Sequence, residues 1–116
     1  MKKWIGFTQF VALSQKVRAA EGFGTGFNYW VKAEFEFSLD FDPEQAKVDL
    51  QQVLLVLDHR ALGLDKTLPV EATSSELAWW ILSELQRLRP GTDVKVHLRR
   101  GDGAIFTCRK SQVGGN

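Results

Sequence analysis

Few side chains in this sequence of 116 residues could carry chemistry. The chain contains two histidines, His59 and His97, and one cysteine, Cys108. Zinc in proteins is held by imidazole, thiolate or carboxylate groups that converge on one tetrahedral centre. A site of three histidines therefore cannot form within one chain, and a single cysteine forms no intrachain disulfide. A mixed metal site with Glu21 or Cys108 stays open as an alternative, but we expect no metal and no other cofactor.

Charge and hydropathy exclude several partner classes. The formal net charge is +1, and the basic residues are scattered apart from Arg99-Arg100, which we interpret as a turn or strand end. This balance gives no indication of a nucleic-acid partner. No apolar segment reaches transmembrane length, and the N-terminus lacks the apolar core of a signal peptide. We therefore expect a soluble cytoplasmic protein without a membrane partner.

The elements that must position these residues begin with strands. Residues 27–37 give the clearest local signal, because every odd-numbered position is apolar and most even-numbered positions are polar. This alternation predicts a half-buried antiparallel strand. Residues 3–13, 93–98 and 104–109 are predicted strands as well. The glycines of residues 100–103 predict a hairpin turn between the last two strands.

Two helices are predicted between the strand pairs. Asp42 and Pro43 suit the N-cap and the first helical position of a helix whose apolar stripe ends at Leu57. Thr73-Ser74-Ser75-Glu76 is a capping box that begins a second helix, and Arg89-Pro90-Gly91 ends it.

The element order strand, strand, helix, helix, strand, strand predicts an α+β fold. Two helices can cover one face of a four-stranded antiparallel sheet. The other face would carry Trp30 among charged side chains, which suits a solvated or interfacial surface. We expect one domain over residues 1–110 and a flexible tail over residues 111–116.

Four segments carry a resemblance to a known family. They are Thr25-Gly26-Phe27-Asn28-Tyr29, Leu57-Asp58-His59 with Leu62, Thr73 with Leu77-Ala78, and Val94-Lys95-Val96-His97-Leu98-Arg99. In order and spacing they resemble the 6-pyruvoyl-tetrahydropterin synthase family, which includes the 6-carboxytetrahydropterin synthases. The resemblance covers residues 7–106. It implies the tunnelling fold, in which protomers join edge to edge into a trimeric barrel and two trimers stack into a hexamer.

The resemblance also implies that the usual reaction is lost. The family binds zinc with three histidines, and Ser14, Thr25 and Phe27 stand in their positions here. By spacing, Glu21 occupies the place of the catalytic cysteine, and a carboxylate does not replace a thiolate nucleophile. Glu21 is then either a residual acid or an exposed loop acid.

Some family positions keep polar residues. Asp58 and His59 match the family's proton relay, in which the acid orients an imidazole that acts as acid or base. They would equally suit the end of a helix. The pterin-anchoring glutamate and its neighbour align with Leu98 and Arg99, so a bidentate carboxylate contact is missing. The implied ligand-binding positions are Thr25, Phe27, Thr73, Ser75, Leu98 and Arg99.

Three functions follow from these observations. We favour a homo-oligomeric protein, trimer or hexamer, that has lost zinc-dependent synthase activity and binds a pterin-like or purine-like heterocycle or acts as a scaffold. The second is a metal-independent enzyme that uses Asp58, His59, Glu21 and Thr25. The third is a small α+β interaction module with exposed tryptophans, since Trp79 and Trp80 cannot both face one core.

Overall fold

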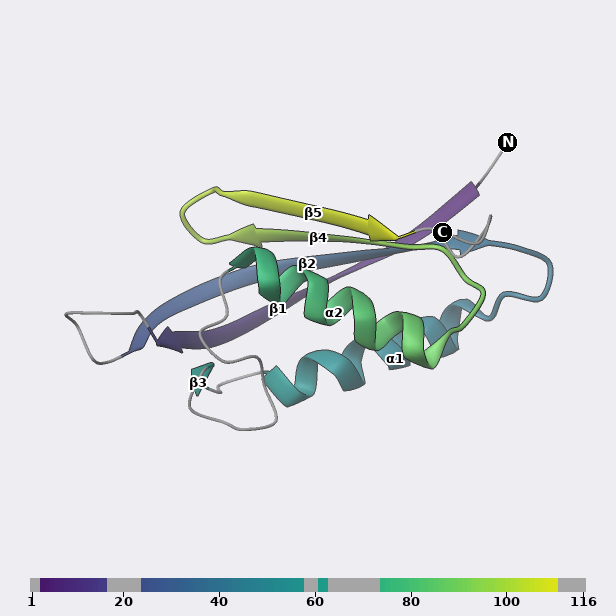
Figure 1. Ribbon diagram of the computed structural model, residues 1–116. Coiled ribbons are helices and arrows are strands. Elements are labelled where there is room, and N and C mark those ends of the chain that lie inside the picture. The colour runs from purple at the N-terminus through teal and green to yellow at the C-terminus, as the bar shows by residue number, and fades with distance from the viewer. Residues whose placement is uncertain (1–2, 17–23, 58–60, 63–73, 111–116) are drawn as a thin grey trace.

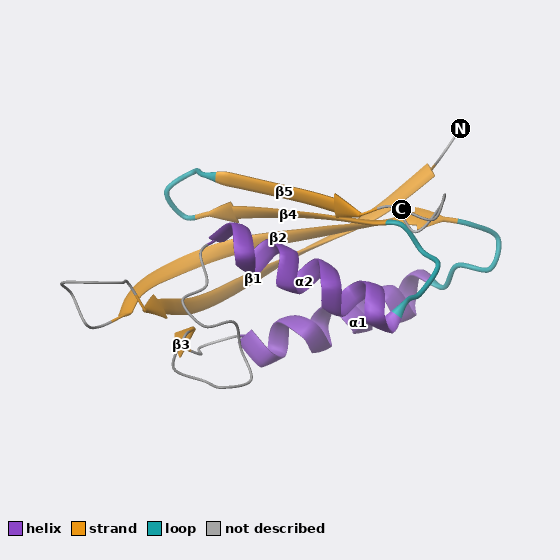
Figure 2. Ribbon diagram, in the orientation of Figure 1, coloured by secondary structure: helices purple, strands orange, loops and turns teal. Residues whose placement is uncertain are grey.

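In a computed structural model, the chain forms one sheet with both helices packed on a single face (Figures 1 and 2). The structure describes residues 3–16, 24–57, 61–62 and 74–110. The elements are β1 (Lys3–Lys16), β2 (Gly24–Phe37), α1 (Pro43–Leu57), β3 (Ala61–Leu62), α2 (Ser74–Leu88), β4 (Val94–Arg100) and β5 (Ile105–Lys110). The predicted order of two strands, two helices and two further strands is confirmed.

The sheet has the strand order β3-β1-β2-β4-β5. The neighbours β1, β2, β4 and β5 are antiparallel, with Phe10 opposite Trp30 and Trp30 opposite Arg99. The short strand β3 adds a parallel pairing of Ala61 with Ser14. The sequence did not predict β3, because two residues are too few to show alternation. The predicted tail, residues 111–116, lies outside the described residues.

The core lies between the sheet and the helices. Along β2, Tyr29, Val31, Ala33 and Phe35 are buried while their neighbours face away from the helices, as the alternation predicted. Each helix contributes the apolar stripe expected of an amphipathic helix. On α2, Trp79 is exposed and Trp80 packs at the margin of the core, so the two rings do diverge. The buried helical side chains are Ala46, Leu50, Val53, Leu54, Leu57, Leu77, Ala78, Ile81, Leu82 and Leu85.

The helix ends follow from local chemistry. Oδ1 of Asp42 accepts hydrogen bonds from the backbone N–H groups of Glu44 at 3.1 Å and Gln45 at 3.3 Å, which confirms the predicted N-cap of α1. After α2, Gly91 adopts φ +86°, the left-handed conformation that follows many helix ends. The capping residue proposed for α2, Thr73, lies outside the described residues.

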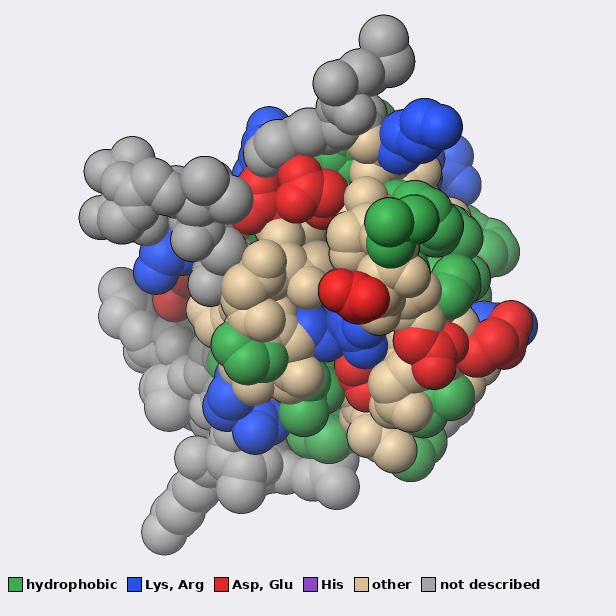
Figure 3. All heavy atoms as spheres, turned by 90° about the vertical axis from the view of Figure 1, so that its right-hand side faces the viewer, with side chains coloured by type: hydrophobic (Ala, Val, Ile, Leu, Met, Phe, Trp, Pro, Cys, Tyr) green, Lys and Arg blue, Asp and Glu red, His purple; other side chains and the backbone are tan. Residues whose placement is uncertain are grey.

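One buried ion pair joins the two helices. Nη1 of Arg89, just past the end of α2, donates to Oδ2 of Asp49 on α1 at 3.0 Å. The Arg89 side chain is 14% exposed and that of Asp49 is 8% exposed. Gln45 donates to the other carboxylate oxygen at 2.9 Å, and the guanidinium lies 5.0 Å from the centre of the Phe41 ring. Figure 3 shows this end of the molecule, where basic side chains lie between acidic ones.

Neither described helix is long and apolar enough to cross a membrane.

We predict that Arg89→Ala lowers the free energy of unfolding by about 3 kcal/mol, because it leaves the Asp49 carboxylate buried without its cation. Urea denaturation measures this change. The matched control is Arg87→Ala, which removes only the exposed pair with Glu84 and costs less than about 1 kcal/mol. Replacing both partners by apolar residues, in Asp49→Leu with Arg89→Met, restores most of the loss. Equal stabilities of the two alanine variants would contradict this account.

Candidate functional site

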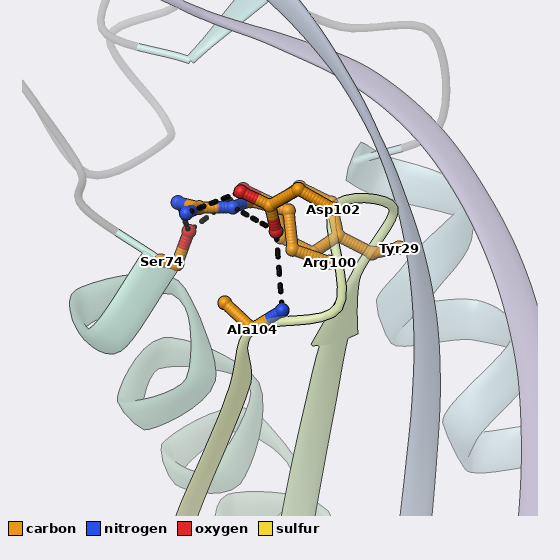
Figure 4. A network of polar contacts seen from close by, with 5 residues as sticks. All are labelled: Tyr29, Ser74, Arg100, Asp102 and Ala104. Carbon is orange, nitrogen blue, oxygen red and sulfur yellow. Dashed lines mark hydrogen bonds and ion pairs between the residues drawn. The ribbon is translucent and has the colours of Figure 1, made fainter.

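Polar side chains gather at the end of the sheet where α2 begins (Figure 4). The hydroxyl of Tyr29 lies 2.9 Å from Oγ of Ser74, and Nη1 of Arg100 donates to the same oxygen at 3.2 Å. Nε and Nη2 of Arg100 donate to the two carboxylate oxygens of Asp102 at 2.9 and 2.8 Å. We call Tyr29, Ser74, Arg100 and Asp102 the sheet-end cluster.

Strand pairing and a tight turn assemble this cluster. Tyr29 on β2 lies directly opposite Arg100 on β4, so both side chains share the face beneath the helices. Ser74 is the first residue of α2. The backbone N–H of Gly103 donates to the carbonyl of Arg100 at 2.8 Å, and the φ of Gly103, +98°, favours glycine there. This turn confirms the predicted hairpin and places Asp102 against Arg100.

The electrostatics of the cluster favour binding over proton abstraction. Burial raises the pKa of Tyr29, and the Ser74 hydrogen bond and the Arg100 charge offset only part of that effect. The hydrogen bonds from Arg100 lower the pKa of Asp102, and Asp102 in turn raises the pKa of Arg100. At neutral pH the cluster therefore holds a neutral phenol, a cation and a compensating carboxylate, and the phenol is a poor base.

A second concave site lies on the face of the sheet opposite the helices. It has a volume of about 470 Å³ and is lined by Thr8, Trp30, Lys32, Glu34, His97, Arg99 and Ile105. We call it the outer-face groove. His97 is held on both sides, since Nε2 lies 2.5 Å from Oε1 of Glu34 and Nδ1 lies 3.1 Å from Oγ1 of Thr107. The groove therefore combines aromatic, cationic and acidic groups.

Known structures share this architecture. The 6-pyruvoyl tetrahydropterin synthase of Caenorhabditis elegans superposes with a TM-score of 0.77 at 19% identity, over 96% of this chain and 97% of that chain. The Plasmodium falciparum synthase gives 0.73 at 13%, over 95% and 98%, and the Plasmodium vivax synthase gives 0.70 at 13%, over 94% and 99%. This chain has the synthase fold. No family model matches the sequence, and no curated protein does.

Of the positions predicted for the site, Thr25 and Phe27 lie on β2, four and two residues before Tyr29. Ser75 follows Ser74 on α2 and is exposed. The remaining predicted residues, Asp58, His59, Glu21 and Thr73, lie outside the described residues.

The side chains of Leu98 and Arg99 do not belong to one site, because they lie on opposite faces of the sheet. Adjacent residues of a strand point to opposite faces. Leu98 is fully buried in the core beneath the helices, whereas Arg99 is exposed and lines the outer-face groove. The groove is therefore open to contacts with Arg99 and closed to contacts with Leu98.

The three positions that the resemblance implies for zinc ligands lie on two paired strands. Ser14 of β1 is paired with Gly26 of β2, the residue between Thr25 and Phe27. Within the described part of the chain, no three His, Cys, Asp or Glu residues are placed to hold a metal. Burial raises the pKa of Cys108 to about 11, so this thiol stays protonated.

The sequence analysis missed the sheet-end cluster. It assigned Tyr29 to the core, Ser74 to a cap, and Arg100 and Asp102 to a turn. A signal was present, because a buried tyrosine hydroxyl needs a hydrogen-bond partner. The partner could not be named, since Ser74 is 45 positions away in the sequence.

We predict that Tyr29 ionises at a higher pH in the folded chain than in the urea-unfolded chain, because burial disfavours the phenolate. Tyr29 is the single tyrosine, so tyrosinate absorbance reports on it alone. The raised pKa adds stability that is complete below about pH 10 and is lost as the pH rises through the folded-state value. Ser74→Ala should raise the folded midpoint further, since the Ser74 hydrogen bond lowers it. A midpoint at or below the unfolded value would contradict this assignment.

Proposed function

We propose that this chain is a small-molecule-binding protein built on the synthase fold, and that it does not catalyse the zinc-dependent synthase reaction. The observation that carries the proposal is the histidine count. Two histidines in the entire chain cannot supply three imidazole ligands, and the resemblance implies Ser14, Thr25 and Phe27 at the corresponding positions.

The bound molecule would be a small heterocycle of pterin-like or purine-like shape. Tyr29, Ser74 and Arg100 support this part of the proposal, because they bring hydroxyl and guanidinium groups together at one end of the sheet. The burial of Leu98 opposes recognition through a carboxylate at that position. An altered ligand, or a purely structural role as a scaffold, fits these substitutions better than the synthase substrate.

A second candidate is a metal-independent enzyme of altered chemistry. The convergence of Tyr29, Ser74 and Arg100 favours it, since an enzyme needs polar groups within hydrogen-bond reach of one another. Asp58, His59 and Glu21 would supply its acid and base. The discriminating test is turnover of the ligand that copurifies with the chain, compared between the parent and Tyr29→Phe. Unchanged ligand mass after incubation supports the binding protein.

We predict that tag-free protein purified without added metal holds less than stoichiometric zinc and does not convert dihydroneopterin triphosphate. Elemental analysis and a turnover assay measure these two quantities. Addition of a chelator should leave the thermal midpoint unchanged, because the fold does not depend on a metal. Turnover above that of a metal-stripped control, or a fall in the midpoint with chelator, would contradict the proposal.

We further predict a homotrimer or homohexamer in native mass spectrometry, assembled through sheet edges. Arg100 pairs with Ala104 through a 2.8 Å hydrogen bond, so alternation directs the N–H of Thr107 away from β4 toward the edge. Thr107→Pro should therefore spare the pairing of β4 with β5 and release folded monomers. A parent that is already monomeric would instead support the interaction-module alternative. A variant that stays assembled would place the contact elsewhere than β5.

A further inference from the structure

The helix-free face of the sheet carries an excess of positive charge. Its described side chains include four cations, Lys32, Lys95, Arg99 and Arg109, and two carboxylates, Glu34 and Glu36. Arg109 is also ion-paired with the buried Asp93 at 3.6 Å. Lys95 and Arg109 both lie against the ring of Trp4, at 4.1 and 5.1 Å from its centre. No described ring lies against Lys32 or Arg99 in this way.

Lys32 and Arg99 are the cations of the outer-face groove, and neither has an ion-pair partner among the described residues. Glu34, the carboxylate in the groove, is held instead by His97. The groove therefore offers two cationic groups, from the neighbouring strands β2 and β4, that are not ion-paired within the described part of the chain. Such groups attract an anion, and a partly enclosed site increases the attraction.

Gly6 allows the long side chains to lie flat on the sheet. A Cβ atom at this position would meet Cε of Lys32 at 3.1 Å and Cγ of Glu34 at 3.2 Å. The stem of Lys32 thus lies over β1 at the place where that strand has no side chain of its own, whereas the carboxylate of Glu34 reaches His97 on β4. The aliphatic part of Lys32 is supported by this backbone, and Lys32 is one of the residues that line the groove.

An aromatic surface adjoins these cations. The ring of Trp30 is 42% exposed and packs edge-on against Phe10 with 5.0 Å between ring centres. Ile105, 65% exposed, lies beyond Arg99 in the same cross-strand row. Exposed tryptophan and isoleucine faces that flank a cation suit a flat apolar ring with an acidic substituent.

The spacing matches one small molecule. Trp30 and Arg99 are directly opposite on neighbouring strands, where Cβ atoms lie about 5 Å apart. Lys32 is the next residue of β2 on this face, about 7 Å further along the strand. A ring at Trp30 would therefore place an attached acidic group within reach of Arg99, whereas the stem of Lys32 runs toward Gly6, the residue paired with Glu34.

We infer that the outer-face groove binds a small planar aromatic anion, with the ring between Trp30 and Ile105 and the carboxylate or phosphate at Arg99, while Lys32 adds positive charge to the groove. This inference rests on the proposal that the chain binds a small molecule. It does not depend on the sheet-end cluster, on the zinc positions or on any assembly.

The test is a titration of the full chain, followed by amide and indole N–H chemical shifts in heteronuclear NMR. The probes are 2-naphthoate, 2-naphthyl phosphate and the uncharged 2-naphthamide. We expect saturable shifts at Trp30, Lys32 and Arg99 with both anions and weaker binding of the amide. The ratio of the two anion affinities assigns the acidic group as carboxylate or phosphate. Added salt should weaken binding of the anions more than binding of the amide.

Two variants and their controls decide the outcome. Arg99→Gln should lower the affinity for 2-naphthoate by about tenfold, because one charge-assisted hydrogen bond is lost. Arg87→Gln on α2 should leave the affinity unchanged. Trp30→Ala should weaken the binding of all three probes. Its control is Trp79→Ala on α2, which removes a ring of similar exposure, 46%, and should leave binding unchanged. Circular dichroism checks that each variant folds. If Trp30→Ala does not fold, Arg99→Gln, a change at an exposed position, still tests the inference.

Absence of shifts at millimolar probe concentrations, or affinities indifferent to Arg99→Gln and Trp30→Ala, would overturn the inference. Saturable shifts at Tyr29, Ser74 and Arg100 instead would overturn the groove as the site but preserve the proposed binding function. The zinc and turnover measurements test that function separately.

Discussion

The alternation of side chains along β2 is the constraint on which the rest of the structure depends. β2 is the central long strand and pairs with β1 on one side and β4 on the other. A slip of one residue in this register would exchange its two faces. Tyr29 would leave the core, and Trp30 would enter it. The two candidate sites therefore exist because Tyr29 and Trp30, adjacent in sequence, point to opposite sides of one sheet.

The burial of Tyr29 in turn fixes the position of α2. A phenolic hydroxyl that leaves water without a partner costs roughly 1–3 kcal/mol. Ser74 supplies that partner from the first residue of α2, and Arg100 donates to the same serine from β4. The hydrogen bonds thus tie two strands and a helix at one end of the molecule. At the other end, the Asp49–Arg89 pair ties α1 to the chain that leaves α2.

The sequence predicted the parts of this fold that have a local pattern. The alternation of β2, the Asp42 cap and the glycine turn after β4 each leave a signal within a few residues. The groove was visible in part, since alternation assigned Trp30, Lys32 and Glu34 to the helix-free face. The sheet-end cluster was not, because Ser74 and Arg100 meet Tyr29 only through tertiary pairing. Leu98 and Arg99 point in opposite directions because side chains alternate along a strand. The resemblance to the family motif had nevertheless assigned both residues to one binding site.

The adjacent arginines of β4 show why one fold can support different functions. Arg100 faces the helices and is neutralised by a bidentate contact with Asp102, so it stabilises the hairpin and the start of α2. Arg99 faces the opposite side, where its cross-strand neighbours Trp30 and Ile105 carry no charge. Packing constrains the first residue and leaves the second available to a ligand. Side chains on the helix-free face can therefore change without cost to the core, whereas changes beneath the helices must preserve Tyr29 and its partners. A substitution that changes the binding specificity should therefore destabilise the fold less at Arg99 than at Leu98.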